Sequence, residues 1–204
     1  PPQGGLRFGA SHRTEYNLFP LSSVKGVVRF KDRPDVELSG LGWGTHTWSH
    51  LGPHEQSTSA TQFRGLDLPN QKTLYMREIQ VGGDYAPQSL SYVVMTSGAQ
   101  LLFQGFGFKK TVKKSFTDKK HPNRYKVAED FSITARDIKH PDVTLEATFS
   151  AKKRTHHRNP ISSYSWILRK LIEQASKPME YAYQMNFKAQ VSGGSNGAAV
   201  IEGT

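Results

Sequence analysis

Apolar and polar side chains alternate along the segment Met179–Val191, and this pattern constrains the fold more than any other feature of the chain. One side of the segment is apolar, and only Ala182 interrupts the polar side. The segment Asp142–Ser150 alternates in the same way. A period of two is typical of a β-strand with one buried and one solvated face. Both segments are therefore predicted to be half-buried strands.

Weaker strand patterns recur along the rest of the chain, with Gly, Pro, Asn and Asp in the gaps. About ten short strands separated by turns are typical of an all-β antiparallel sandwich or barrel, and not of alternating strands and helices. The further predicted strands are Val24–Phe30, Val36–Ser39, Thr45–Ser49, Ala60–Arg64, Thr73–Val81, Ser89–Thr96, Ala99–Phe103, Phe131–Ile138 and Ala198–Glu202.

One amphipathic helix is predicted at Ser162–Ser176, near the C-terminus. Ser162 or Ser163 can cap its start, and Pro178 closes its end. Its apolar stripe is expected to pack on the outside or across one mouth of the sheet, with membrane insertion as the alternative. The stripe consists of Tyr164, Ile167, Leu168, Leu171, Ile172 and Ala175.

The length and composition favour one domain without covalent staples. The chain has 204 residues and no cysteine, which excludes disulfides and thiolate metal sites. Residues 1–20, with prolines, glycines and no clear period, are predicted to be an N-terminal strap or linker, and residues 21–204 the β-domain. No apolar run reaches the length of a membrane span, and the start lacks a signal-peptide layout. We expect an intracellular, reducing location, cytoplasmic or peripheral to a membrane, with a mitochondrial one as the alternative.

The positive charge is concentrated in two stretches, Lys109–Lys126 and Lys152–Arg158. The first holds eight basic residues and one acid, the second four basic residues and no acid, so together they carry +11 and the rest of the chain −1, for a net charge of +10. These stretches are predicted to be basic loops that attract anionic membrane headgroups or an acidic protein, with a merely solvated loop as the alternative. Nucleic acid is a less favoured partner because no recognition motif accompanies the charge. The residues concerned are Lys109, Lys110, Lys113, Lys114, Lys119, Lys120, Arg124, Lys126, Lys152, Lys153, Arg154 and Arg158.

The segment Ser39–His50 is rich in glycine, tryptophan and histidine. In one extended strand, Gly40, Gly42 and Gly44 share a face with His46 and Trp48, which opens a trough for a ligand or marks a bend in the sheet. His46 and His50 would stand about 13 Å apart, too far to share a metal ion, so no metal site is predicted.

Aromatic and methionine side chains supply a candidate apolar wall, although the same residues suit an ordinary core. No nucleophile motif and no dinucleotide-binding loop occurs, and neither a catalytic residue nor a cofactor is predicted. The predicted ligand-binding residues are Trp43, His46, Trp48, Tyr75, Met95, Tyr183, Met185 and Phe187.

Several short motifs occur in an order that resembles a known family. They are Pro20 with Val24-x-Gly26, Glu37 to Gly40-x-Gly42, Gly52-Pro53-His54, Lys177-Pro178, Tyr181-x-Tyr183-Gln184 and the final Glu202-Gly203-Thr204. This order resembles the second half of the fungal oxidative-stress survival-factor family, whose members are similar to tandem lipocalin-like barrels. Relatives include carotenoid hydratases, tocopherol cyclases and Diels–Alderases. The resemblance implies a lipocalin-like antiparallel barrel of about 8–10 strands and handling of ceramide-like lipids. The basic stretch Lys109–Lys126 is a departure from the family pattern.

Three functions are therefore expected, in this order. The first is non-catalytic binding of a hydrophobic ligand, such as a sphingolipid, in a barrel whose basic loops contact anionic headgroups. The second is an accessory or structural subunit of a larger assembly, with a barrel filled by its own side chains. The third is an isomerase or cyclase that uses His46 or a buried carboxylate as an acid. A large apolar void would favour the first, and a packed interior the second.

Overall fold

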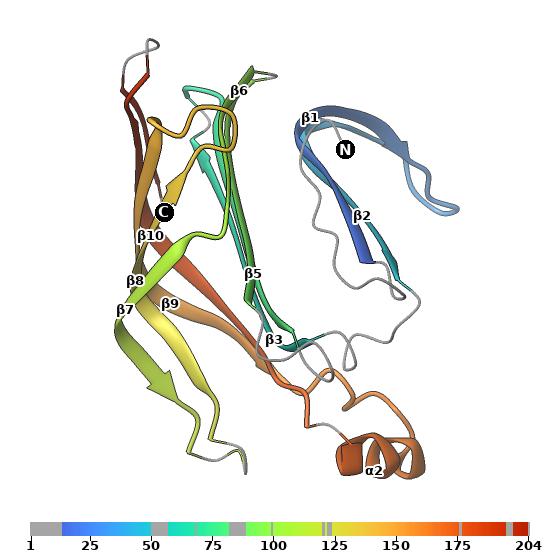
Figure 1. The fold of residues 1–204 in the computed structure, drawn as a ribbon. Coiled ribbons are helices and arrows are strands. Elements are labelled where there is room, and N and C mark those ends of the chain that lie inside the picture. The colour runs from blue at the N-terminus through green and yellow to red at the C-terminus, as the bar shows by residue number, and fades with distance from the viewer. Residues whose placement is uncertain are drawn as a thin grey trace.

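The computed structural model describes residues 14–49, 57–67, 69–81, 89–98, 100–119, 121, 124–175, 177–194 and 198–203, with the backbone alone for residues 14–23, 41–49, 57, 81 and 175. Within these ranges the chain forms three antiparallel sheets and one helix (Figure 1). A five-stranded sheet and a four-stranded sheet face each other, and a two-stranded ribbon lies beside the four-stranded one (Figure 1). The prediction of an all-β antiparallel fold is confirmed.

The two-stranded ribbon pairs β1 (Thr14–Val28) with β2 (Val36–Ser49). The sequence predicted two short strands where β2 is continuous, and it placed Thr14–Pro20 in a strap where β1 begins. The pairing register shifts between Phe19 and Ser22, around Pro20. Such an irregularity accommodates proline because proline has no N–H to donate to the ladder.

The other nine strands of the described chain form a meander in which consecutive strands pair within each sheet. The four-stranded sheet has the order β3-β4-β5-β6, and the five-stranded sheet the order β11-β10-β9-β8-β7. The bounds are β3 (Ser57–Asp67), β4 (Lys72–Val81), β5 (Ser89–Ser97), β6 (Gln100–Phe106), β7 (Lys109–Thr117), β8 (Lys126–Arg136), β9 (Thr144–Arg158), β10 (Glu180–Ser192) and β11 (Ala199–Gly203).

The two large sheets approach each other along both edges without a continuous ladder. Between β6 and β7 the chain passes from one sheet to the other at Gly107, whose φ of 67° favours glycine. There, Gly105 and Asp137 form an isolated bridge. At the other edge β11 lies beside β3. None of the described sheets is closed into a barrel, so the predicted lipocalin-like closure is not confirmed.

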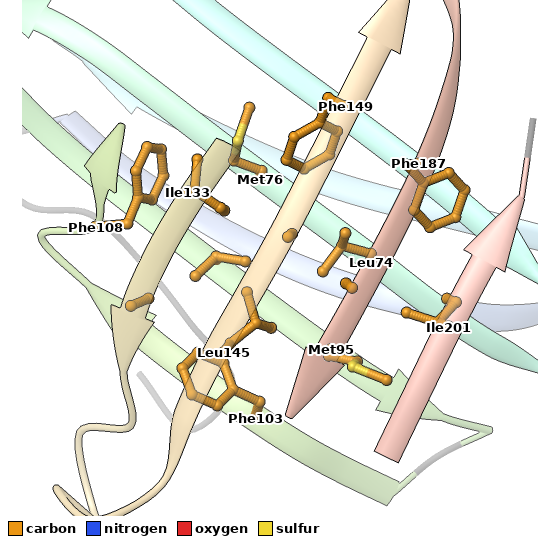
Figure 2. Packing of buried hydrophobic residues seen from close by; sticks show 14 of the residues in the cluster. Leu74, Met76, Met95, Phe103, Phe108, Ile133, Leu145, Phe149, Phe187 and Ile201 are labelled. Atoms are coloured by element: carbon orange, nitrogen blue, oxygen red, sulfur yellow. The ribbon is translucent and has the colours of Figure 1, made fainter. Parts of the chain in front are cut away.

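The hydrophobic core fills the space between the two large sheets (Figure 2). Its aromatic part joins β3 to the five-stranded sheet. The rings of Phe63 and Phe149 meet edge to face at 4.7 Å, and those of Phe63 and Phe187 at 5.1 Å. The Phe187 ring lies directly over Gly65, where an added Cβ would stand 2.5 Å from it. Aromatic pairs of this kind stabilise a core beyond their buried area.

The other face of the four-stranded sheet is also buried. Tyr75 and Tyr92 are each 2% exposed, and the hydroxyls of Thr73 and Thr96 lie 2.8 Å apart. The β1–β2 ribbon lies on this side of the sheet (Figure 1), and β1 contacts β4. Because both faces of the sheet are buried, the side chains in the middle of β5 do not alternate between buried and exposed.

The helix α2 (Trp166–Ala175) begins four residues after the predicted start, because residues 160–163 form turns and residue 164 a bend. The predicted stripe is present on the helix, but its packing against a sheet is not observed. Ile167, Leu168 and Leu171 remain about half exposed. In Figure 1 the helix stands at one end of the molecule, away from the core.

Candidate functional site

The predicted apolar wall is divided by the structure. Met95 and Phe187 are buried in the core between the large sheets, and Met185 packs against it. Tyr75 points to the opposite face of β4 from the core residues Leu74 and Met76. The prediction did not foresee that both faces of this sheet are buried.

Of the four remaining predicted wall residues, Tyr183 lies on β10 and the other three lie on β2. His46 stands opposite Asn17 and Trp48 opposite Glu15 in the β1–β2 ladder, while Trp43 lies between the paired Gly42 and Gly44. The side chains of Trp43, His46 and Trp48 lie outside the described part of the chain, as does His50.

The two basic stretches lie mostly on strands rather than in loops, and the prediction of basic loops was wrong in this respect. Lys109, Lys110, Lys113 and Lys114 are on β7, Lys126 begins β8, and Lys152, Lys153, Arg154 and Arg158 are on β9. Lys119 and Arg124 lie in the turn between β7 and β8, and Lys120 is outside the described residues. Strand β7 escaped prediction because its lysines interrupt the apolar alternation.

The strands that carry this charge separate into a fork. The ladder between β8 and β9 ends at the pair Asp130–Ser150. Beyond it, β8 remains paired with β7 and β9 with β10, so two hairpin arms continue. One carboxylate oxygen of Asp130 accepts bonds from Ser150 Oγ at 2.9 Å and from the Ala151 N–H at 3.3 Å. These bonds stabilise the point of separation.

A hollow of about 280 Å³ lies between the two arms. Phe116 and the Lys114–Glu129 ion pair, at 3.2 Å, come from the β7–β8 arm, and Arg154 and Tyr183 come from the β9–β10 arm. The Arg154 guanidinium stacks over the Phe116 ring at 4.5 Å, a cation–π contact between the arms. Lys152 and Lys153 complete the rim, where basic groups outnumber acids.

Two ionisable groups of the hollow, Tyr183 and Lys114, have a raised pKa. Burial raises the pKa of Tyr183, so its hydroxyl stays neutral and can donate a hydrogen bond. That hydroxyl is buried without a hydrogen-bond partner of good geometry. The hydrogen bond to Glu129 raises the pKa of Lys114, which therefore stays charged. The hollow thus combines fixed positive charge with a hydroxyl donor.

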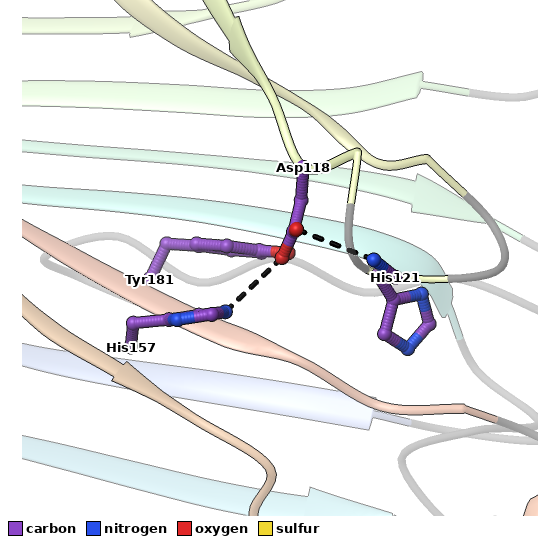
Figure 3. Close-up of polar contacts among 4 residues, drawn as sticks. All are labelled: Asp118, His121, His157 and Tyr181. Atoms are coloured by element: carbon purple, nitrogen blue, oxygen red, sulfur yellow. Dashed lines mark hydrogen bonds and ion pairs between the residues drawn. The ribbon is translucent and has the colours of Figure 1, made fainter.

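The far end of the fork is held by the buried carboxylate of Asp118, which is 4% exposed (Figure 3). Tyr181 Oη donates to Asp118 Oδ2 at 2.9 Å, and His157 Nε2 lies 3.1 Å from the same oxygen. The His121 N–H donates to Oδ1 at 3.3 Å. Burial, followed by the bond to Asp118, raises the pKa of Tyr181 to about 12. We call Asp118, His157 and Tyr181 the clasp.

Sequence reasoning missed the clasp, although one signal was present. Asp118 is the only acid in the stretch Lys109–Lys126. Its partners come from the ends of β9 and β10, which no spacing rule connects to it. Among the described residues, no three His, Asp or Glu side chains gather in a way that could hold a metal ion.

A second hollow, of about 400 Å³, opens along β8–β10 and is lined partly by polar and charged side chains, including Lys113, Asp130 and Lys188. The aromatic rings of Phe131, Phe149 and Phe187, which belong to the core cluster, line the same hollow, whereas the hollow between the arms shares no residue with that cluster. The core cluster itself consists of packed side chains from both large sheets.

Comparison with known proteins finds no counterpart for this chain. No family model, no curated protein and no solved structure matches it. The resemblance to the survival-factor family stays a prediction from the motifs. Within the described residues, α2 is the one helix, and it is too short to cross a membrane.

Proposed function

We propose that this chain is a non-catalytic binding module, an accessory or structural subunit whose interior is a packed scaffold and whose fork binds an anionic group of a partner. The observation that carries the proposal is the hollow between the arms, which Lys152, Lys153 and Arg154 line together with a single carboxylate, that of Glu129. Glu129 is in turn paired with Lys114. An anion entering the hollow would therefore meet a surplus of positive charge.

Three features make the fork a suitable anion site. Arg154 offers guanidinium donors in a fixed plane because it is stacked on Phe116. The Tyr183 hydroxyl is buried and supplies a further donor. The clasp holds the two arms together, so the donors are positioned before an anion arrives, which lowers the entropic cost of binding.

A second proposal is carriage of a hydrophobic ligand in a closed lipocalin-like barrel, as the survival-factor resemblance implies. It is supported by the meander order of β3 to β11 and by the half-buried Tyr183 and Met185 beyond the core. Organic extraction of the purified protein followed by mass spectrometry tests it. A stoichiometric lipid would favour this proposal, and its absence, together with no uptake of a fluorescent lipid analogue, would exclude it.

The fork is tested by neutralising its three cations on β9. The triple variant Lys152→Gln/Lys153→Gln/Arg154→Gln is compared with the wild type for binding of fluorescent poly-glutamate and of heparin. We expect its affinity to fall by at least about tenfold, because every lost contact to an anion weakens an electrostatically driven complex.

A matched control exists near the β1–β2 turn. Lys25, Lys31 and Arg33 have the same composition, and the Arg33 guanidinium likewise lies over an aromatic ring, that of Phe30, at 3.6 Å. The variant Lys25→Gln/Lys31→Gln/Arg33→Gln removes the same charge and is expected to stay within about twofold of the wild type. Equal losses in both variants would show that only net charge matters and would refute the fork as the site.

A further inference from the structure

The helix α2 presents an apolar stripe that the described part of the chain does not cover. Ile167, Leu168 and Leu171 are 57%, 46% and 58% exposed, and Tyr164, just before the helix, is 48% exposed. Ile167, Leu168 and Leu171 share one face of the helix, because they recur at helical spacing. Neighbouring apolar side chains exposed to this degree on one face are typical of an interaction surface rather than of chance.

The helix is nevertheless attached to the sheets at both ends. Before it, Ile161 is buried, and its carbonyl accepts from the Tyr164 N–H at 3.1 Å. After it, the Lys177 carbonyl accepts a hydrogen bond of 2.8 Å from Tyr125 Oη, in the connection between β7 and β8. The stripe is therefore held on an anchored element, next to part of the basic stretch Lys109–Lys126.

The surroundings of the stripe are positively charged. Arg169 and Lys170 lie on the helix, Lys177 follows it, and the Tyr125–Lys177 contact brings Arg124 to the same end of the molecule. The one acid on the helix is Glu173. Trp166 lies on the polar side, with Lys170 Nζ 5.8 Å from its ring centre. Tryptophan beside lysine is typical of side chains that lie at the level of lipid headgroups.

We propose that α2 binds the interfacial region of an anionic lipid bilayer, with its apolar stripe between the headgroups and its cations on lipid phosphates and carboxylates. A helix of 10 residues is about 15 Å long, too short to span a bilayer but suited to lie in its surface. The positive charge around the stripe complements an anionic membrane. This inference rests on the proposed function, in which the fork binds an anionic group, and deepens it by naming an anionic membrane as the partner.

The first experiment measures flotation of the full chain with vesicles of phosphatidylcholine alone and of phosphatidylcholine with one-third phosphatidylserine. The wild type is expected to bind the anionic vesicles and not the neutral ones. The variant Ile167→Ser/Leu171→Ser is expected to lose at least about tenfold in partition coefficient, because it removes two apolar side chains that enter the interface.

The control variant is Val36→Ser/Leu38→Ser on β2. These side chains are exposed to a similar degree, 46% and 51%, but they lie on a different element. This variant is expected to stay within about twofold of the wild type. Circular dichroism and the thermal midpoint establish that both variants are folded, which surface substitutions to serine should allow.

A second readout reports the depth of the helix. Trp166 lies on the polar side, so the reporter is placed on the stripe instead by comparing Trp166→Phe with Trp166→Phe/Leu168→Trp. Anionic vesicles should shift the tryptophan emission of the double variant to shorter wavelength, and Trp166→Phe alone should lack that change. Equal emission changes in the two variants would place the contact elsewhere and overturn the proposal.

The remaining outcomes separate this inference from the proposed function. Poly-glutamate binding at the fork without vesicle binding would overturn the membrane partner and leave the anion site intact. A concentration-dependent dimer that the Ile167→Ser/Leu171→Ser variant abolishes, with no vesicle binding, would assign the stripe to a second copy instead. Equal vesicle binding by the wild type and this variant would also contradict the proposal.

Discussion

The Nε2 atom of His157 lies 3.1 Å from Oδ2 of Asp118, and this contact joins the end of β9 to the turn after β7. The backbone ladder between β8 and β9 has already ended at Asp130 and Ser150. Side chains therefore hold the far ends of the arms together. The imidazole also stacks on the Tyr181 ring at 5.1 Å, so ring packing and hydrogen bonding support the same geometry.

Replacing the clasp carboxylate should destabilise the fold. Asp118→Asn keeps the size of the side chain but removes the charge that accepts from Tyr181, so we expect a loss of about 1–3 kcal/mol in the free energy of unfolding. Urea denaturation followed by circular dichroism measures it. Asp35→Asn, on an exposed carboxylate 3.8 Å from Arg29, should change stability by less than about 0.5 kcal/mol. Equal changes in both would show that the clasp contributes nothing particular.

Tyr181 should make stability depend on alkaline pH. Burial and the bond to Asp118 raise its pKa from 10.0 to about 12 in the folded protein. Its stabilising contribution is therefore fully present below pH 10.0 and is lost as the pH rises through about 12. The difference in unfolding free energy between the wild type and Tyr181→Phe should shrink over this range. A constant difference would contradict the raised pKa.

The ion pair between Lys110 and Glu78 should stabilise the contact between the two large sheets. Its atoms are 2.7 Å apart, and the two side chains are 16% and 15% exposed. Glu78→Gln leaves a nearly buried ammonium without its charge partner and should cost roughly 3 kcal/mol. The double variant Lys110→Met/Glu78→Leu should be less damaging than Glu78→Gln alone. Denaturant midpoints of the two variants measure the difference. A double variant at least as unstable as Glu78→Gln would refute a stabilising role for the ion pair's charge balance.

Gly65 should tolerate no side chain while Phe187 is present. A Cβ there would lie 2.5 Å from the Phe187 ring, so Gly65→Ala should cost about 1–3 kcal/mol through overpacking. Combining it with Phe187→Leu, which shortens the opposing side chain, should reduce the penalty of the alanine. Additive losses in thermal denaturation would show that the two positions are not in contact.

The sequence was sufficient to predict a strand when all the side chains on one of its faces enter the same core. The alternation of Met179–Val191 corresponds to β10, because Phe187, Ala189 and Val191 all enter one core. The alternation did not predict β7, because Lys110 occupies an inward position on this strand. Its charge is paired there with Glu78 from the other sheet. A local pattern does not contain such a distant partner.

The candidate site was predictable in its charge but not in its shape. The basic residues could be counted from the sequence, yet the fork depends on where the β8–β9 ladder ends and on a clasp built from three separate segments. The helix α2 was likewise predicted from its stripe. That the stripe would stay exposed could not be predicted, because exposure depends on the position of the whole helix.

The most direct test of the account is to map the binding surface by nuclear magnetic resonance while short poly-glutamate is added to the isotope-labelled chain. The account predicts that backbone amide shifts concentrate in Lys114–Phe116 and Ala151–Arg154, at the fork. Shifts confined to the β1–β2 ribbon, or spread evenly over all exposed lysines, would contradict it.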